Sequence, residues 1–341
     1  MGALVTASGL SHSYGKVKAL EKLDLQLQAG QSVAFIGPDG VGKSTLLGLL
    51  AGAKRLQDGA LDIFGGNVRQ KSMQAMLQQR AAYMPQGLGK NLYPELSIRE
   101  NLEFFARLYE HSKAEREARI HRLTAATGLE PFLDRPAGKL SGGMKQKLGL
   151  CCALIHDPEM LILDEPTTGV DPLSRRQFWS LIDDIRAGQK DLTVLVATSY
   201  MDEANRFDRV IMMNDGAIIA DGTPAALLEK SGTDSLERAF ITFLPEDART
   251  QHREPKAEPR DLSGRKVAIE AKGLTKRFGG FTAVDHVDFT IPTGEIYGFL
   301  GSNGCGKTTT MKMLTGLLPV SEGESMLFGN RLNPDDLDNR R

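Results

Sequence analysis

Two glycine-rich loops constrain the fold of this chain more than any other feature. Each loop fits the pattern G-x-x-x-x-G-K-[ST], follows a short apolar run and precedes a helix-like segment. In that setting the glycines let backbone N–H groups surround phosphate oxygens, and the helix N-terminus adds a favourable dipole. The sequence therefore predicts two phosphate-binding loops, each between a strand and a helix.

Individual positions of these loops have expected roles. Lys43 supplies a positive charge for the β and γ phosphates of a nucleotide, and the Ser44 hydroxyl is a ligand for Mg²⁺. A plain glycine-rich turn is the alternative, which two copies of the full pattern make negligible. The nucleotide contacts predicted for the first loop are Gly37, Pro38, Asp39, Gly40, Val41, Gly42, Lys43, Ser44 and Thr45. Those predicted for the second are Gly301, Ser302, Asn303, Gly304, Cys305, Gly306, Lys307, Thr308 (also a Mg²⁺ ligand) and Thr309.

The two loops belong to an internal repeat. Lys43 and Lys307 lie 264 residues apart, and the same spacing aligns Gly9 with Gly273 without a gap. This pattern predicts a tandem duplication of one domain. A second copy as long as the first extends past Arg341, so we expect the chain to hold a truncated second copy and to be a fragment of a longer protein.

The repeat divides the chain into three parts. Residues 1–244 form a complete first copy, and residues 267–341 form the N-terminal part of a second copy. Between them, residues 245–266 are charged and contain three prolines, which indicates a solvated linker, with a short amphipathic helix as the alternative. The truncated copy is expected to expose apolar side chains in 296–300 and 311–318.

Alternating apolar and helix-like segments predict an α/β fold with a mostly parallel sheet in the first copy. The stretch 97–126 is charged and has helical periodicity, so we expect exposed helices with a solvated basic face; contact with RNA or a membrane is the alternative. The expected strands are 33–36, 161–163, 194–197 and 210–213.

The segment MLILDEP at 160–166 is an apolar strand that ends in two acids. In an open α/β sheet the carboxyl ends of the strands border the nucleotide crevice. Asp164 is therefore placed to hold Mg²⁺, directly or through water, and Glu165 to act as general base or to orient the attacking water. The alternative is a pair of surface acids, which the upstream phosphate loop disfavours.

A serine followed by two glycines begins another helix-like stretch. Such a helix start offers backbone N–H groups to an anion, although it also fits a simple helix cap. Its position between the phosphate loop and the acid-ended strand favours the anion site. The segment consists of Leu140, Ser141, Gly142, Gly143, Met144, Lys145 and Gln146.

These motifs, in this order, resemble the nucleotide-binding domains of ATP-binding cassette (ABC) proteins. The resemblance implies a P-loop NTPase fold with a RecA-like core, an antiparallel β subdomain near the N-terminus and a helical subdomain at about 87–140. It implies ATP and Mg²⁺ as cofactors. It also implies a head-to-tail pair of domains, in which ATP lies between the phosphate loop of one domain and the serine–glycine segment of the other.

The resemblance also implies roles for residues outside these motifs. Tyr14 matches the aromatic residue that stacks on adenine, and Phe278 is its counterpart in the second copy. Gln86 matches a glutamine that links Mg²⁺ and the attacking water to the helical subdomain. The loop that crosses to the partner domain corresponds to Gly169, Val170 and Asp171.

One position departs from the family pattern. Ser199 stands where the family has a histidine, between the strand TVLVA and the segment MDEA. A serine is shorter than a histidine and cannot carry a positive charge. Losing one preorganised donor to a transition state costs about 3–4 kcal/mol, or roughly 10²–10³ in rate. We therefore predict a catalytic role for Ser199 in a site that binds ATP well and cleaves it slowly.

Composition limits the partners. The formal net charge is −1, from 42 basic and 43 acidic residues, so no global field favours DNA. The three cysteines have neither a disulfide framework nor metal-ligand spacing, so we expect buried thiols in a reducing cytosol. No apolar run approaches the ~18–20 residues of a membrane span.

The resemblance extends to drug-exporter ATPases and to bacterial ribosome-associated ATPases, which are also described as multidrug-type ABC transporters with tandem ATPase domains. The leading hypothesis is an ATPase that pairs with a second ABC domain and drives a membrane permease from the cytoplasmic face of the plasma membrane. A translation ATPase that acts on the ribosome is the alternative, which the short linker disfavours. A third possibility is a chain that only binds nucleotide.

Overall fold

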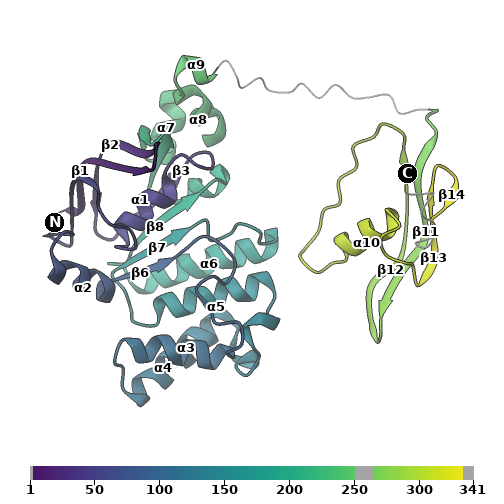
Figure 1. Cartoon of the computed structure of the whole chain (residues 1–341), viewed down its shortest axis with the longest axis horizontal. Helices are drawn as coiled ribbons and strands as arrows, with labels where there is room; N and C mark the ends of the chain where they lie inside the picture. The colour runs from purple at the N-terminus through teal and green to yellow at the C-terminus, as the bar shows by residue number, and fades with distance from the viewer. Residues whose placement is uncertain (1–2, 250–263, 333–341) are drawn as a thin grey trace. The chain divides into compact units, whose positions relative to one another are not determined.

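The computed structural model of the chain describes residues 3–249 and 264–332. Within these residues the chain divides into two compact units, one built from residues 3–170 and 174–249 and the other around residues 264–332 (Figure 1). Each unit starts with two long antiparallel strands and continues into a glycine-rich loop and a helix.

A six-stranded sheet, in the order β10-β9-β3-β8-β7-β6, forms the centre of the first unit. All neighbouring strands pair in parallel except β10, which is antiparallel to β9 at one edge. The parallel sheet predicted from the four apolar runs is confirmed. The strands are β3 (Ser32–Ile36), β6 (Ala81–Met84), β7 (Met160–Asp164), β8 (Thr193–Thr198), β9 (Arg209–Asn214) and β10 (Ala217–Gly222).

Helices cover both faces of this sheet, and α3, α4 and α5 lie together at one end of the unit (Figure 1). Ser97 and Ser112 cap α3 and α4 with complete capping boxes, so the charged stretch is helical as predicted. No helix in the described part of the chain is long and apolar enough to cross a membrane. The α-helices are α1 (Lys43–Leu50), α2 (Lys71–Arg80), α3 (Ile98–Leu108), α4 (Lys113–Thr127), α5 (Gly142–Leu154), α6 (Pro172–Gly188), α7 (Pro224–Ser231), α8 (Leu236–Phe243) and α9 (Glu246–Arg249). Short 3-10 helices are η1 (Glu130–Phe132), η2 (Ala137–Lys139) and η3 (Met201–Arg206).

β3 shows why the central strands have continuously apolar sequences. All of its residues are buried. Val33 and Phe35 belong to the core cluster that includes α1, whereas Ala34 and Ile36 belong to the cluster that includes α5. A strand that is covered on both faces has no polar alternation. This rigid strand leads directly into the first glycine-rich loop.

A smaller antiparallel sheet, in the order β2-β1-β4-β5, packs over α1. It confirms the expected antiparallel β subdomain near the N-terminus. Its strands are β1 (Ala3–Tyr14), β2 (Val17–Gln28), β4 (Asp58–Ile63) and β5 (Gly66–Asn67).

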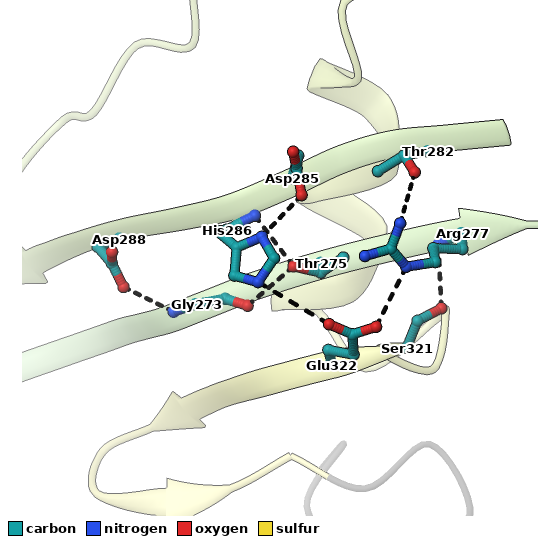
Figure 2. A network of polar contacts seen from close by, with 9 residues as sticks. All are labelled: Gly273, Thr275, Arg277, Thr282, Asp285, His286, Asp288, Ser321 and Glu322. Carbon is teal, nitrogen blue, oxygen red and sulfur yellow. Dashed lines mark hydrogen bonds and ion pairs between the residues drawn. The ribbon is translucent and has the colours of Figure 1, made fainter.

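The second unit has a sheet of corresponding order, β12-β11-β13-β14. Equivalent positions also make equivalent contacts: Asp288 Oδ1 accepts a hydrogen bond from Gly273 N at 2.6 Å, as Asp24 Oδ1 does from Gly9 N at 2.8 Å (Figure 2). Further contacts in Figure 2 join Arg277 to Thr282, Ser321 and Glu322, and His286 to Thr275, Asp285 and Glu322. The elements of this unit are β11 (Val267–Phe278), β12 (Phe281–Pro292), α10 (Lys307–Leu314), β13 (Glu322–Leu327) and β14 (Asn330–Arg331).

Residues 295–300 differ from β3, their counterpart in the first unit. They form no strand, and the side chains of Ile296 and Leu300 are 92% and 95% exposed. β3 is paired on both sides, with β8 and β9, and the described residues of the second unit contain no such partners. Met311 and Leu317 are exposed as well. The predicted exposure of apolar side chains in this copy is confirmed for these four residues and is wrong for Met313 and Leu314, which are buried in the small core of the unit.

The expectation that all cysteines are buried is wrong for one of them. Cys151 and Cys152 are buried in α5, and burial raises the pKa of the Cys151 thiol to about 12. Cys305 is exposed, because it lies in the second glycine-rich loop, which no neighbouring sheet covers.

The expected linker at 245–266 falls largely outside the described residues. Its first part forms the short helix α9, the alternative weighed for this segment. Ala248 packs against the core of the first unit, and the Arg249 guanidinium donates a hydrogen bond to Leu244 O at 3.0 Å. The first unit therefore continues to residue 249.

Candidate functional site

The first glycine-rich loop joins β3 to α1 in a conformation that only glycine allows at two positions. Gly37 and Gly42 have φ angles of 151° and 101°. A Cβ atom on Gly37 would lie 2.3 Å from Met213 O, and one on Gly42 would lie 2.2 Å from Ala19 O. The close approach of neighbouring backbone therefore requires both glycines of the sequence pattern.

Lys43 folds back over this loop. Its Nζ donates hydrogen bonds to Gly37 O at 2.7 Å and to Pro38 O at 2.9 Å, and its side chain is only 4% exposed. The same Nζ lies 3.6 Å from Glu165 Oε1. One positive charge is thereby held between the loop and the end of β7, where it can attract a phosphate group.

Ser44 and Asp164, both assigned to Mg²⁺ from the sequence, are in direct contact. Ser44 Oγ donates to Asp164 Oδ1 at 2.8 Å, and the Tyr83 hydroxyl donates to Oδ2 at 3.3 Å. Burial raises the pKa of the Asp164 carboxyl, and the two hydrogen bonds act in the opposite direction. A hydroxyl and a carboxylate are the hard oxygen ligands that Mg²⁺ prefers, so this pair fits the predicted ion. Tyr83 was not predicted, because one strand tyrosine carries no functional signal.

Glu165 directly follows β7 and has a left-handed backbone, with φ of 48°, which is strained for a residue with a side chain. Its Oε2 accepts hydrogen bonds from Thr168 Oγ1 at 2.9 Å and from Ser199 Oγ at 3.2 Å. Its Oε1 has no hydrogen-bond partner within the described residues. The structure thus brings Glu165, Ser199 and Lys43 together, and the buried Oε1 of Glu165 faces the Lys43 ammonium without a hydrogen bond.

A buried carboxylate beside these loops was missed by the sequence analysis. Glu203 in η3 accepts hydrogen bonds from Thr167 Oγ1 at 2.9 and 3.1 Å and from Thr198 Oγ1 at 3.2 Å. Its side chain is 7% exposed, and Arg175 Nε lies 3.5 Å from it. Glu203 therefore ties the loop after β7 to the end of β8. In the sequence it follows another acid, Asp202, so nothing distinguishes it from a solvated charge.

Tyr14 lies beside the phosphate loop, whereas Gln86 makes no comparable contact. The Tyr14 hydroxyl is 3.3 Å from Thr45 Oγ1, and the residue is 48% exposed, as stacking on a base requires. Gln86 follows β6, is exposed, and has no hydrogen bond within the described residues. The contact assigned to Gln86 with Mg²⁺ stays a prediction.

The serine–glycine segment forms the N-terminus of α5. Ser141 Oγ accepts a hydrogen bond from Met144 N at 3.3 Å, so the helix-cap interpretation is confirmed. Gln146 is buried and donates a hydrogen bond to Pro166 O, which connects α5 to the loop after β7. Ser141 itself is exposed, so the start of α5 is open. Its role toward a second nucleotide stays a prediction, as does the role of the loop at 169–171.

The second glycine-rich loop reproduces the shape of the first, but its lysine has no acid beside it among the described residues. Lys307 Nζ donates to Gly301 O and to Ser302 O, both at 2.7 Å, in the same pattern as Lys43. Thr308 and Phe278 are exposed, and within the described residues Lys307 forms no ion pair. The described part of the second unit therefore has a loop of the same shape, and no carboxylate of that part is paired with its lysine.

Comparisons with known proteins agree with these motifs. A family profile described as "ABC transporter" matches residues 20–168 and 284–341. The probable multidrug ABC transporter ATP-binding protein YbhF of Escherichia coli is 36% identical, over 96% of this chain and 67% of the relative. The Nod factor export ATP-binding protein I of Burkholderia lata is 37% identical, over 66% of this chain and 72% of the relative. A solved structure of an ATP-binding subunit of an ABC transporter is 30% identical, with a TM-score of 0.62 over 70% of this chain and 99% of that chain. The chain belongs to the ABC transporter family, as an ATP-binding protein and ATPase.

Proposed function

We propose that the first unit binds ATP with Mg²⁺ at its phosphate loop and hydrolyses it slowly. The observation that carries this proposal is the cluster of Lys43, Ser44, Asp164 and Glu165 at the carboxyl ends of β3 and β7. Lys43 binds the β and γ phosphates, Ser44 and Asp164 would hold Mg²⁺, which would supply positive charge beside the phosphates, and the Glu165 carboxylate accepts a proton from the attacking water.

The contact between Ser199 and Glu165 supports slow cleavage. The Ser199 hydroxyl lies 3.2 Å from Glu165 Oε2 and donates its only proton to that oxygen. No second donor remains on this side chain for the γ phosphate, and the hydroxyl cannot carry a positive charge. The site therefore lacks one donor for the transition state and retains the groups that bind the nucleotide.

The proposed working unit is a pair of ABC domains. Residues 1–244 act as one nucleotide-binding domain, with the helical subdomain at about 87–140, and residues 267–341 contribute to a second. The open start of α5 then faces a nucleotide on the partner domain, and the loop at 169–171 contacts that partner. The similarity to YbhF and to the Nod factor export protein supports a membrane permease as the component that is driven, with the ATPase at the cytoplasmic face of the plasma membrane.

Binding of a fluorescent ATP analogue to the whole chain tests the assigned site. Lys43→Ala is expected to weaken the tighter binding component by at least about tenfold, because it removes a charge-assisted contact to phosphate. Lys307→Ala is the matched control, since it makes the same change in the exposed second loop; it should leave the tighter component unchanged. Loss of that component with Lys307→Ala alone would assign ATP to the second loop and contradict the proposal.

A separate measurement distinguishes the transporter from the translation ATPase. Co-sedimentation of the chain with membranes, rather than with ribosomes, is expected at moderate salt. Ribosome binding that disappears with added salt reports charge alone. Ribosome binding that resists salt, in the absence of membrane association, would contradict the transporter role.

A further inference from the structure

A cavity on the first unit lies outside the site described above. Its volume is about 560 Å³, and small-molecule sites usually have about 300–1,000 Å³. The half-buried side chains of Leu56 and Val68 form part of its apolar wall, whereas the lining residues Leu49, Leu61 and Leu77 are buried. Neither the first phosphate loop nor the two acids at the end of β7, Asp164 and Glu165, line it. A ligand bound in this cavity would therefore be distinct from the nucleotide expected at that loop.

Every charged residue that lines the cavity is basic. Its charged lining residues are Lys54, Arg55, Arg69 and Lys71, and no acid lines it. Within the described residues none of the four forms an ion pair, and the Arg69 guanidinium donates to the backbone oxygens of Gln57 at 3.0 Å and Gly59 at 3.4 Å. Like charges that share one cavity repel one another, and a bound anion removes that repulsion.

Helix α2 places two neutral donors, Gln74 and Gln78, beside the basic Lys71 on the same wall. Lys71, Gln74 and Gln78 are three and four residues apart, which places them on one face of the helix, and all three line the cavity. Side-chain amides and cations both donate hydrogen bonds to phosphate oxygens. Together with Leu56 and Val68, these donors fit a ligand that has a phosphate group and an apolar body.

The internal repeat provides a comparison for these basic residues. At the spacing of 264 residues, Lys54, Arg55, Arg69 and Lys71 correspond to Leu318, Pro319, Asn333 and Asp335. Within its described residues the second unit builds the corresponding sheet and the helix α10, and Leu318 and Pro319 stand there where the first unit has Lys54 and Arg55. The sheet and this helix therefore form without the charges of Lys54 and Arg55, and their presence in the first unit needs another reason.

We propose that this cavity is a binding site for a phosphate-bearing ligand with an apolar body. Lys54 connects it to the nucleotide site, because its Nζ lies 5.1 Å from the centre of the exposed Tyr14 ring. A phosphate held by Lys54 shifts this ammonium relative to the ring. Occupancy of the cavity is then coupled to nucleotide affinity, and the coupling is reciprocal. The site itself depends only on its lining residues and not on the proposed hydrolysis.

Calorimetric titration of the whole chain with phenyl phosphate tests the site. Both phosphate loops are first saturated with a non-hydrolysable ATP analogue and Mg²⁺, so that they cannot bind the probe. We expect phenyl phosphate to bind, phenol not to bind, and the double variant Arg55→Gln/Lys71→Gln to weaken binding roughly tenfold or more. The matched control, Arg99→Gln/Lys190→Gln, removes the same charge from exposed positions elsewhere in the first unit and should bind as the unsubstituted chain does.

Sedimentation with vesicles of phosphatidylglycerol and phosphatidylcholine separates two sources of the phosphate. Binding of phenyl phosphate without vesicle binding identifies a soluble organophosphate. Vesicle binding that the cavity variant weakens and the control variant does not identifies a lipid headgroup. The proposal is overturned if neither probe binds, or if the control variant weakens binding as much as the cavity variant does.

Discussion

At the scale of single residues, Glu203 joins the loop after β7 to the end of β8. It accepts hydrogen bonds from Thr167 in that loop and from Thr198 at the end of β8, and its side chain is almost fully buried. Both hydroxyls are donors here, so the position requires a group that only accepts. A carboxylate provides two such oxygens, and Arg175 nearby compensates its charge.

Glu203→Gln is therefore expected to lower ATP turnover while ATP affinity changes little. The amide has the same size, but its NH₂ group cannot accept a hydrogen bond from a hydroxyl, so one loop loses its contact. Loss of one hydrogen bond to a charged group costs about 1.5–3 kcal/mol. We therefore expect turnover to be roughly tenfold slower while the ATP Kd stays unchanged.

Asp202→Asn is the matched control, because it makes the same chemical change at the exposed neighbouring position. It should leave turnover unchanged. If Glu203→Gln lowers the melting temperature and leaves turnover intact, Glu203 stabilises the fold without positioning the loops.

At the scale of elements, the end of α5 carries a pH-sensitive contact. The His156 ring stacks on Tyr109, with ring centroids 3.9 Å apart and planes within 6° of parallel. Burial lowers the pKa of His156 to about 4, against the opposing effects of the Ala81 backbone and Asp157, and the neighbouring His111 and Arg119 lower it further. The folded chain therefore binds this proton less tightly than the unfolded chain, in which a histidine has a pKa of about 6.5.

The stability of the first unit should consequently fall as the pH drops from about 6.5 toward 4, and this contribution is fully present above about pH 6.5. His156→Phe keeps the ring stack and cannot bind a proton. Denaturant midpoints measured at neutral pH and at about pH 5 should differ less for this variant than for the unsubstituted chain. Equal differences in both proteins would show that His156 does not contribute to acid sensitivity.

The elements themselves were predictable where local pattern and burial coincide. β3, β7, β8 and β9 are covered on both faces, so their continuous apolar runs identify them, and the glycine pattern identifies the loop after β3. Residues 295–300 carry an equally apolar run yet form no strand, because a strand needs neighbours that the run itself does not encode. Glu203 and Tyr83 were unpredictable for the same reason, since their partners come from distant parts of the sequence.

At the scale of the whole molecule, the two units differ in how many of their apolar side chains are buried. The sheet of the first unit is covered by helices on both faces, whereas the second unit has a small core around Leu274 and Leu314 and exposes Ile296 and Leu300. Local opening is easiest where few apolar contacts are buried. The second unit is therefore expected to open more often than the first.

Hydrogen exchange of the whole chain measures this difference. Backbone amides of β3 and β8 should remain protected much longer than those across residues 269–330. Strong protection across 269–330, equal to that of β3, would show that the second unit is stable as it stands.

The central claim is that the first unit has a complete ATP-binding site whose cleavage step is limited by Ser199. Single-turnover cleavage of ATP by the whole chain, with and without Ser199→His, tests it most directly when ATP Kd is measured in parallel. The predicted result is an unchanged Kd and a cleavage rate that rises by roughly 10²–10³, because the imidazole restores a donor to the transition state. An unchanged or lower cleavage rate in Ser199→His at unchanged Kd, or turnover of tens per second in the unsubstituted chain, would contradict it.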